Sequence, residues 1–181
     1  MRAAWEPMLY ELDHARRGRL LSFATALAGS NAAEDLVQEA VVATFSRHRG
    51  FASVGQAEHY VRRAIATKYV DSQRKAISAR VSERRASVVE AVPDGTAGVI
   101  AEDAVSRALR ALAPRVRACV VLRYLEDLSI RDTASTLGLS EGAVKRYVSD
   151  GISQLNLALG TTDDFAKLAD VGVLSVKEGT R

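Results

Sequence analysis

Residues Ser129 to Gly151 carry the side chains whose types and spacing are best suited to a binding site. The segment reads SIRDTASTLGLSEGAVKRYVSDG. Ser129 and Ser140 each precede a run of helix-forming residues and Gly138 separates the runs, which predicts two short helices joined by a tight turn. Small and basic residues at the start of a second helix can enter a major groove and reach base edges and phosphates. The predicted chemistry is recognition of duplex DNA, and an ordinary helical hairpin with solvated charges is the alternative.

The second predicted helix has an apolar stripe on one side and small and charged residues on the other. Its charges from Glu141 to Leu155 sum to zero. Attraction to phosphate must therefore come partly from arginines that precede it, such as Arg131. The candidate residues for contact with duplex DNA are Arg131, Ser140, Glu141, Gly142, Ala143, Lys145, Arg146 and Ser149.

A second candidate nucleic-acid surface lies between Phe45 and Lys75. This segment has seven basic and two acidic residues, a net charge of +5. It combines a predicted loop over residues 49–59, which contains two glycines, with a predicted helix over residues 60–75. A basic helix can follow a phosphate backbone, and an adjoining loop can hold an unstacked base. A solvated basic helix face is the alternative.

Groups that could support catalysis or bind a metal are scattered along the sequence. The three histidines, His14, His48 and His59, lack the spacing of metal ligands. Cys119 is the single cysteine, and no glycine-rich phosphate-binding motif occurs. We therefore expect no enzymatic activity, no metal and no cofactor.

Composition indicates a cytoplasmic protein with a modest core. The chain has 181 residues, of which 48% are hydrophobic and only 6% aromatic, so Ala, Val and Leu must form most of the core. A single cysteine fits a reducing compartment. The N-terminus is interrupted by charges throughout, and no apolar run approaches the length of a membrane span, so neither a signal peptide nor a transmembrane helix is expected.

Helical periodicity dominates the chain and predicts an all-α fold. Two small helical domains are expected, over residues 7–75 and 101–159. Residues 76–100 are expected to form a flexible linker, with a helical start as an alternative, because their apolar residues are sparse and poorly phased. The two domains should therefore reorient freely. Residues 160–181 form a tail whose role the sequence leaves open.

Three stretches in these domains resemble one bacterial family. NAAEDLVQEAVVATF and YVRRAIATKYVDSQRK resemble two consecutive helices of RNA polymerase sigma factors. ALRALAPRVRACVVLRYLEDLSIRDTASTLGLSEGAVKRYVSDGISQL resembles their helix-turn-helix region. The order and spacing are similar to the extracytoplasmic-function group, which has only domains two and four. The resemblance covers roughly residues 10 to 159. Thr133, Ala143 and Tyr147 depart from the usual pattern, which affects the expected promoter sequence.

The resemblance implies a role for each part of the chain. The first domain would dock on core RNA polymerase and capture a flipped base of the −10 element, and the second would read the duplex −35 element. The implied partners are promoter DNA, the clamp helices of the largest polymerase subunit, the flap of the second subunit and an anti-sigma factor. The free protein would be a monomer associated with the nucleoid.

The family pattern also places these roles on residues of this sequence. The segment from Asn31 to Thr44 has a net charge of −3 and no basic residue, which suits a basic polymerase surface. The implied polymerase-binding residues are Asp35, Leu36, Gln38 and Glu39. The implied −10 residues are Arg49, Phe51, Ser53, Gln56, His59, Tyr60, Arg62, Arg63, Lys68 and Arg74.

Two other functions are alternatives to a sigma factor. A helix-turn-helix regulator that dimerises on an operator would account for the second domain, but it leaves the sigma-like helix pair unexplained. A helical adaptor that binds only protein would not need the segment of charge +5. Neither alternative explains both domains.

Overall fold

The computed structural model describes residues 5–47, 50–86 and 104–160. Within these ranges the chain forms seven α-helices and no strand, in agreement with the predicted all-α class. The helices are α1 (Glu6–Ala28), α2 (Ser30–Arg47), α3 (Val54–Ala86), α4 (Ala104–Ala111), α5 (Pro114–Tyr124), α6 (Ile130–Leu137) and α7 (Glu141–Leu159). None of the helices in the described ranges is long and apolar enough to cross a membrane.

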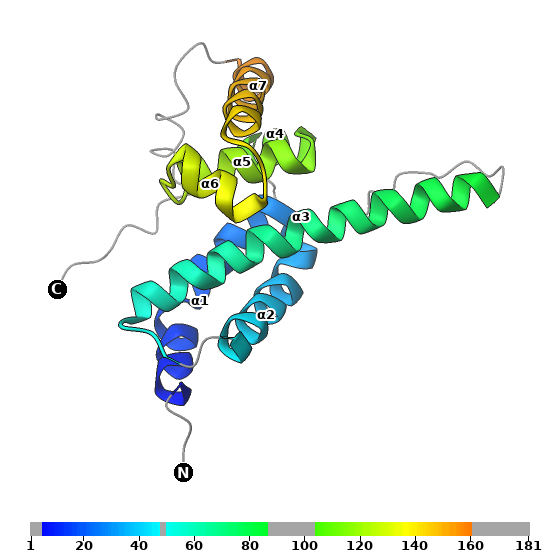
Figure 1. Cartoon of the computed structure of the whole chain (residues 1–181). Helices are drawn as coiled ribbons and strands as arrows, with labels where there is room; N and C mark the ends of the chain where they lie inside the picture. Colours follow the sequence, from blue (N-terminus) through cyan, green and yellow to red (C-terminus); the bar gives the residue numbers. More distant parts are fainter. Residues whose placement is uncertain (1–4, 48–49, 87–103, 161–181) are drawn as a thin grey trace.

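Helices α1, α2 and α3 pack against one another as the first domain (Figure 1). Gly29 reverses the chain between α1 and α2 with a φ of 81°, a backbone conformation that favours glycine. The side chains between the three helices are almost fully buried, and their spacing of three and four residues is that of one helix face. They include Leu20, Phe23, Leu27, Val37, Val61 and Ile65.

Helix α3 is longer at both ends than the sequence predicted. The Ser53 hydroxyl accepts a hydrogen bond from the Gln56 amide at 3.2 Å, so Ser53 caps the helix and α3 begins at Val54. The predicted loop over residues 49–59 is therefore wrong from residue 54 onward. At the other end α3 continues through residues 76–86, the start of the predicted linker, where a helix was the alternative, and this part projects from the body of the protein (Figure 1). The remaining predicted linker residues, 87–100, lie outside the described ranges.

The predicted helix-turn-helix is confirmed in the second domain. The Ser129 hydroxyl accepts from the Asp132 amide at 3.0 Å and caps α6. Gly138 ends α6 in the left-handed conformation with a φ of 63°. The Ser140 hydroxyl then accepts from the Ala143 amide at 3.1 Å and caps α7. Helices α4 and α5 complete the domain, and α7 packs on α4, α5 and α6.

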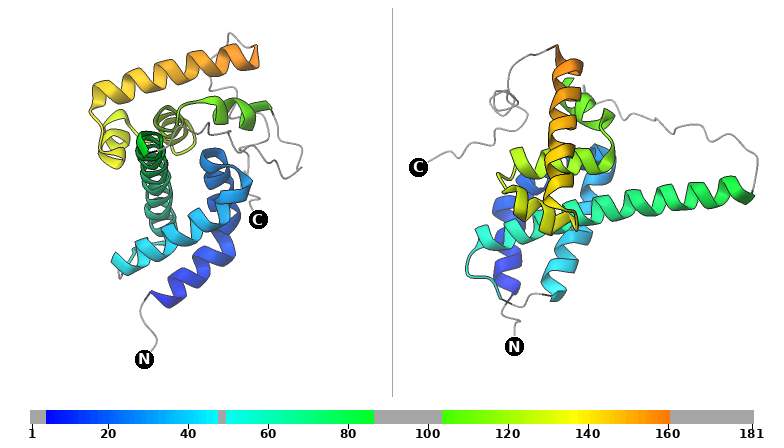
Figure 2. Two further views of the ribbon diagram at one scale, coloured as in Figure 1. Left: turned by 90° about the vertical axis from the view of Figure 1, so that its right-hand side faces the viewer. Right: turned by 45° about the horizontal axis from the view of Figure 1, so that its top comes forward.

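The two domains pack together, which differs from the free reorientation expected from the sequence. Helix α1 contacts α4 and α5, and α3 contacts α5 and α6 (Figure 2). One continuous cluster of buried apolar side chains contains residues of both domains, such as Ile65 and Val121. The Arg117 guanidinium of α5 also donates to the Leu27 carbonyl at the end of α1, at 2.5 Å. The composition of the linker therefore did not predict whether the domains pack together, because that contact is made mainly by apolar faces of the domains themselves.

Candidate nucleic-acid interface

The candidate duplex-binding residues gather on the first half of α7 and the start of α6. Arg131, Lys145, Arg146 and Ser149 are exposed, and so are Glu141 and Gly142, whereas Ala143 is half-buried. Helix α7 lies at the edge of the molecule opposite the start of α1 (Figure 2). Ser140 is also exposed, but its hydroxyl is used as the helix cap. This surface therefore offers three cations and an uncovered helix N-terminus to a partner.

The residues around the start of α3 contribute mainly to structure. Phe51 lies in an aromatic cluster, with its ring centroid 5.2 Å from that of Phe45 and 5.8 Å from that of Tyr60. Phe51 and Tyr60 are half-buried, and Phe51 packs against the core. The role of Phe51 in binding the −10 element stays a prediction. Ser53 caps α3, and the Gln56 side-chain oxygen accepts from the Ala52 amide at 2.7 Å. Arg49 lies outside the described ranges.

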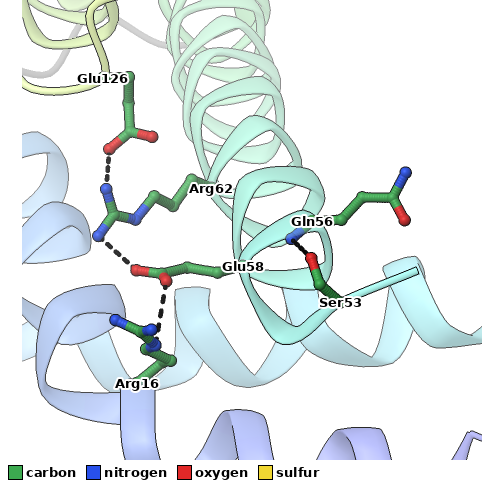
Figure 3. A network of polar contacts seen from close by, with 6 residues as sticks. All are labelled: Arg16, Ser53, Gln56, Glu58, Arg62 and Glu126. Atoms are coloured by element: carbon green, nitrogen blue, oxygen red, sulfur yellow. Dashed lines mark hydrogen bonds and ion pairs between the residues drawn. The ribbon is translucent and has the colours of Figure 1, made fainter. Parts of the chain in front are cut away.

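A chain of buried ion pairs runs through Arg62 (Figure 3). Its Nη2 lies 2.6 Å from Oε1 of Glu58, and its Nη1 donates to Glu126 in the loop between α5 and α6. Glu58 also pairs with Nε of Arg16 in α1, at 3.6 Å. The side chains of Glu58, Arg62 and Glu126 are only 9%, 18% and 6% exposed. Arg62 was predicted as a DNA contact, but here both of its terminal nitrogens are bound to carboxylates.

Burial shifts the pKa values of two groups at this chain of ion pairs, Glu126 and His59. It raises the pKa of Glu126 above its ordinary value, and the nearby Arg62 guanidinium opposes this rise. Burial also lowers the pKa of His59, with Arg63 and Arg62 lowering it further, so the imidazole favours its neutral form. The sequence contained one usable signal, since Glu58 and Arg62 are spaced i, i+4 on a helix. The pairing with Glu126 joins residues 64 positions apart and has no local signature.

The other predicted −10 residues lie farther along α3. His59 and Arg63 are half-buried, and Arg74 is exposed with its Nη2 3.4 Å from Asp71. Lys68 donates to Oε2 of Glu39 in α2 at 3.2 Å. The structure therefore joins a predicted DNA contact to a predicted polymerase contact.

The candidate polymerase-binding residues share α2. Asp35, Gln38 and Glu39 are exposed, whereas Leu36 is half-buried and packs against the core. Beside them, a groove of about 530 Å³ runs between α1 and α2. Its apolar lining includes Val42, which is 61% exposed, and Gln38 lies on its border. The sequence did not predict this groove, which forms only when the two helices pack.

Comparison with known proteins identifies the family. The model of the sigma-70 region 4 family matches residues 102–155, which contain α4 to α6 and most of α7. An RNA polymerase sigma-E factor of Streptomyces avermitilis is 33% identical over 141 residues, covering 72% of this chain and 73% of that protein. The ECF RNA polymerase sigma factor SigM of Mycobacterium tuberculosis is 33% identical over 134 residues, covering 72% of this chain and 66% of that protein.

One solved structure supports the fold. It is the sigma factor RpoE in complex with the anti-sigma factor NepR from Bartonella quintana, with a TM-score of 0.59 over 88% of this chain and 96% of that one. At 21% identity this likeness bears on the fold alone. The sequence relatives are transcription initiation factors, and none supports the dimeric regulator. The chain belongs to the extracytoplasmic-function sigma factors of bacterial RNA polymerase, which direct promoter-specific initiation of transcription.

Proposed function

We propose that the chain divides promoter recognition between its two domains. Helix α7 reads the duplex −35 element, and α2 docks on core polymerase. The face of α3 that carries His59, Arg62 and Arg63 holds unpaired DNA of the −10 element. The observation that carries this proposal is the exposed first half of α7, which begins at the Ser140 cap and presents Lys145 and Arg146. A base-specific contact in the major groove contributes about 1–3 kcal/mol of discrimination.

The role of α3 rests on its charge and its neighbours. Arg62 and Arg63 are adjacent on α3 and His59 lies about one turn before them, whereas Lys68 lies on another side of the helix, where it pairs with Glu39 of α2. A basic helix of this kind can follow the phosphates of a single strand. Extruding a base costs a few kcal/mol of stacking and pairing, which contacts along α3 must offset.

Docking on polymerase is assigned to the exposed acids of α2. Asp35 and Glu39 lie one turn apart and would face a basic partner, for which we propose the clamp helices of the largest subunit. The helix-turn-helix domain would lie on the flap of the second subunit. An anti-sigma factor would bind the same surfaces, in keeping with the NepR complex of the RpoE neighbour. The protein would act on the nucleoid in the cytoplasm.

Reconstitution with core polymerase tests these assignments separately. Asp35→Asn combined with Glu39→Gln should weaken binding to core polymerase, whereas Glu11→Gln, an exposed acid on α1, should not. Arg146→Ala should relax selection at one base position of −35 sites chosen from a random pool. Arg80→Ala removes an equal charge at an exposed position outside the candidate surfaces and should leave selection unchanged. Equal effects of the α2 variants and Glu11→Gln would refute the docking assignment.

A further inference from the structure

The face of α3 assigned to the −10 element is covered by the second domain. Helix α3 contacts α5 and α6 along this face. The Thr67 hydroxyl lies 3.3 Å from the Thr136 carbonyl of α6, and the charge of Asp132 acts on His59. Arg62 pairs with Glu126 one turn before Thr67. DNA laid along this face would have to displace α6 and the loop that precedes it.

Arg62 cannot pair with Glu126 and bind a DNA phosphate at the same time. Its Nη2 is bound to Glu58, which lies on the same helix and keeps this pairing wherever the second domain lies. Its Nη1 is bound to Glu126 of the second domain, so that nitrogen is the one available to exchange between a carboxylate and a phosphate. Glu126 is nearly buried at 6% exposure, so opening returns a desolvated carboxylate to water and offsets part of the lost pairing.

We propose that Glu126 is an autoinhibitory latch: its pairing with Arg62 adds to the apolar packing that holds the second domain over the −10 face, and the free protein cannot bind unpaired promoter DNA until the domains separate. This inference rests on the proposed function of the α3 face. The candidate −35 surface on α7 stays exposed in the closed arrangement, so the latch acts on one of the two DNA surfaces. Separation of the domains on polymerase would then expose the −10 face at the moment it is needed.

Glu126 is a suitable residue to change, because the backbone bonds of its loop do not use its side chain. Leu125 donates to the Val121 carbonyl at 2.9 Å and Leu128 to the Leu122 carbonyl at 3.1 Å. Glu126→Ala therefore removes the latch and leaves the loop closed. Asp127→Asn is the matched control, because it removes the same charge from the adjacent exposed residue. Asn also tolerates the positive φ of 49° at this position.

Two measurements on the full-length protein test the latch. The first is the distance between labels on cysteines introduced at the exposed positions Glu11 of α1 and Gln154 of α7, read by pulsed electron resonance. The wild type and Asp127→Asn should give one narrow distribution, and Glu126→Ala should add a second population at longer distances. The second is binding of a fluorescent single-stranded DNA of random sequence without polymerase. If the open form is a minor species of the wild type, Glu126→Ala should tighten this binding at least about tenfold.

Each outcome separates the latch from the function on which it rests. Unchanged distances in Glu126→Ala would overturn the latch, provided that circular dichroism shows native helix content. If the domains open in Glu126→Ala but binding of single-stranded DNA is unchanged, autoinhibition is overturned. Promoter melting by Arg63→Ala in reconstituted holoenzyme then shows whether the α3 face binds the −10 element at all. Loss of promoter melting in Arg63→Ala would keep the α3 face as the −10 site, whereas normal melting would reject that site. As a second variant, Thr67→Cys with Thr136→Cys, joined by a short bis-maleimide, should block binding of single-stranded DNA, and the single cysteine variants should not.

Discussion

Gly151 provides the sharpest test of how α7 packs on α5. It is buried in the middle of α7. A Cβ at this position would lie 2.5 Å from Cγ2 of Val120 and 2.9 Å from Cγ1 of Val116, both in α5. These valines are 0% and 8% exposed, and a valine in a helix has essentially one χ1 rotamer. Neither methyl group can turn away, so Gly151→Ala must push the two helices apart.

The free energy of unfolding of Gly151→Ala reflects two opposing effects. Alanine is favoured over glycine inside a helix by about 1 kcal/mol. Inserting an extra carbon into a close-packed core costs about 1–3 kcal/mol, and contacts below 3 Å with rigid methyl groups belong to the upper part of this range. The net expectation is a loss of about 1–2 kcal/mol, since overpacking exceeds the gain in propensity.

Urea denaturation followed by circular dichroism measures this change, with Gly18→Ala as the matched control. Gly18 is exposed inside α1, and a Cβ there would meet nothing within 4 Å. Gly18→Ala should therefore stabilise the protein by about 0.5–1 kcal/mol through helix propensity alone. A stabilisation of similar size by Gly151→Ala would refute the close approach of α7 to α5.

Other residues give independent predictions. Thr133 is fully buried, and its hydroxyl has no hydrogen-bond partner among the described residues, so Thr133→Val should raise the free energy of unfolding by about 1 kcal/mol in urea melts. Burial raises the pKa of Cys119 to about 12, so the folded thiol should resist iodoacetamide at mildly alkaline pH and react once the chain is unfolded. The unfolded thiol ionises first as the pH rises past its ordinary value, so this residue should lower stability progressively above that pH. Arg117 is 8% exposed and donates to the carbonyls of Leu27 and Leu112, so Arg117→Ala should destabilise the protein by about 1–3 kcal/mol for each buried carbonyl left without a donor, measured in the same melts. Arg131→Ala should lower the slope of log affinity against log salt for duplex DNA by about one, as measured by fluorescence anisotropy.

Elements that depend on local side-chain chemistry could be predicted from the sequence. The serine caps of α6 and α7 and the left-handed Gly138 need only residues within one turn of each other. The buried stripe of α7 likewise follows from helical spacing, and Val144 and Leu155 are fully buried. From spacing alone, the two helices could form either a DNA-binding motif or an ordinary helical hairpin. The family resemblance is what assigned them a role in DNA binding.

The start of α3 shows where local signals compete. Gly50 and Gly55 and the small residues between them are typical of a loop, and they led to the loop prediction although Ser53 is a residue type that can cap a helix. Glycine costs little in the first turn of a helix, where the amides lack intrahelical partners in any case. The loop is therefore shorter than predicted, and Gln56 and His59 lie on the helix.

Contacts between the domains could not be predicted from local patterns. Glu126 and Arg62 are brought together only when α5 and α6 settle on α3, and Arg117 reaches Leu27 from 90 positions away. The sequence gives no periodic signal for such pairs. As a result Arg62 was assigned to DNA without the carboxylates that hold it in the closed protein.

Run-off transcription with purified bacterial core polymerase on a pool of random −35 and −10 sequences tests the central claim most directly. The wild-type protein should produce defined start sites that are absent with core polymerase alone, and the templates used should share two spaced elements. Lys145→Ala with Arg146→Ala should abolish selection of the upstream element while the downstream element is kept. No added transcription, together with polymerase-independent binding to a palindromic site, would contradict the account.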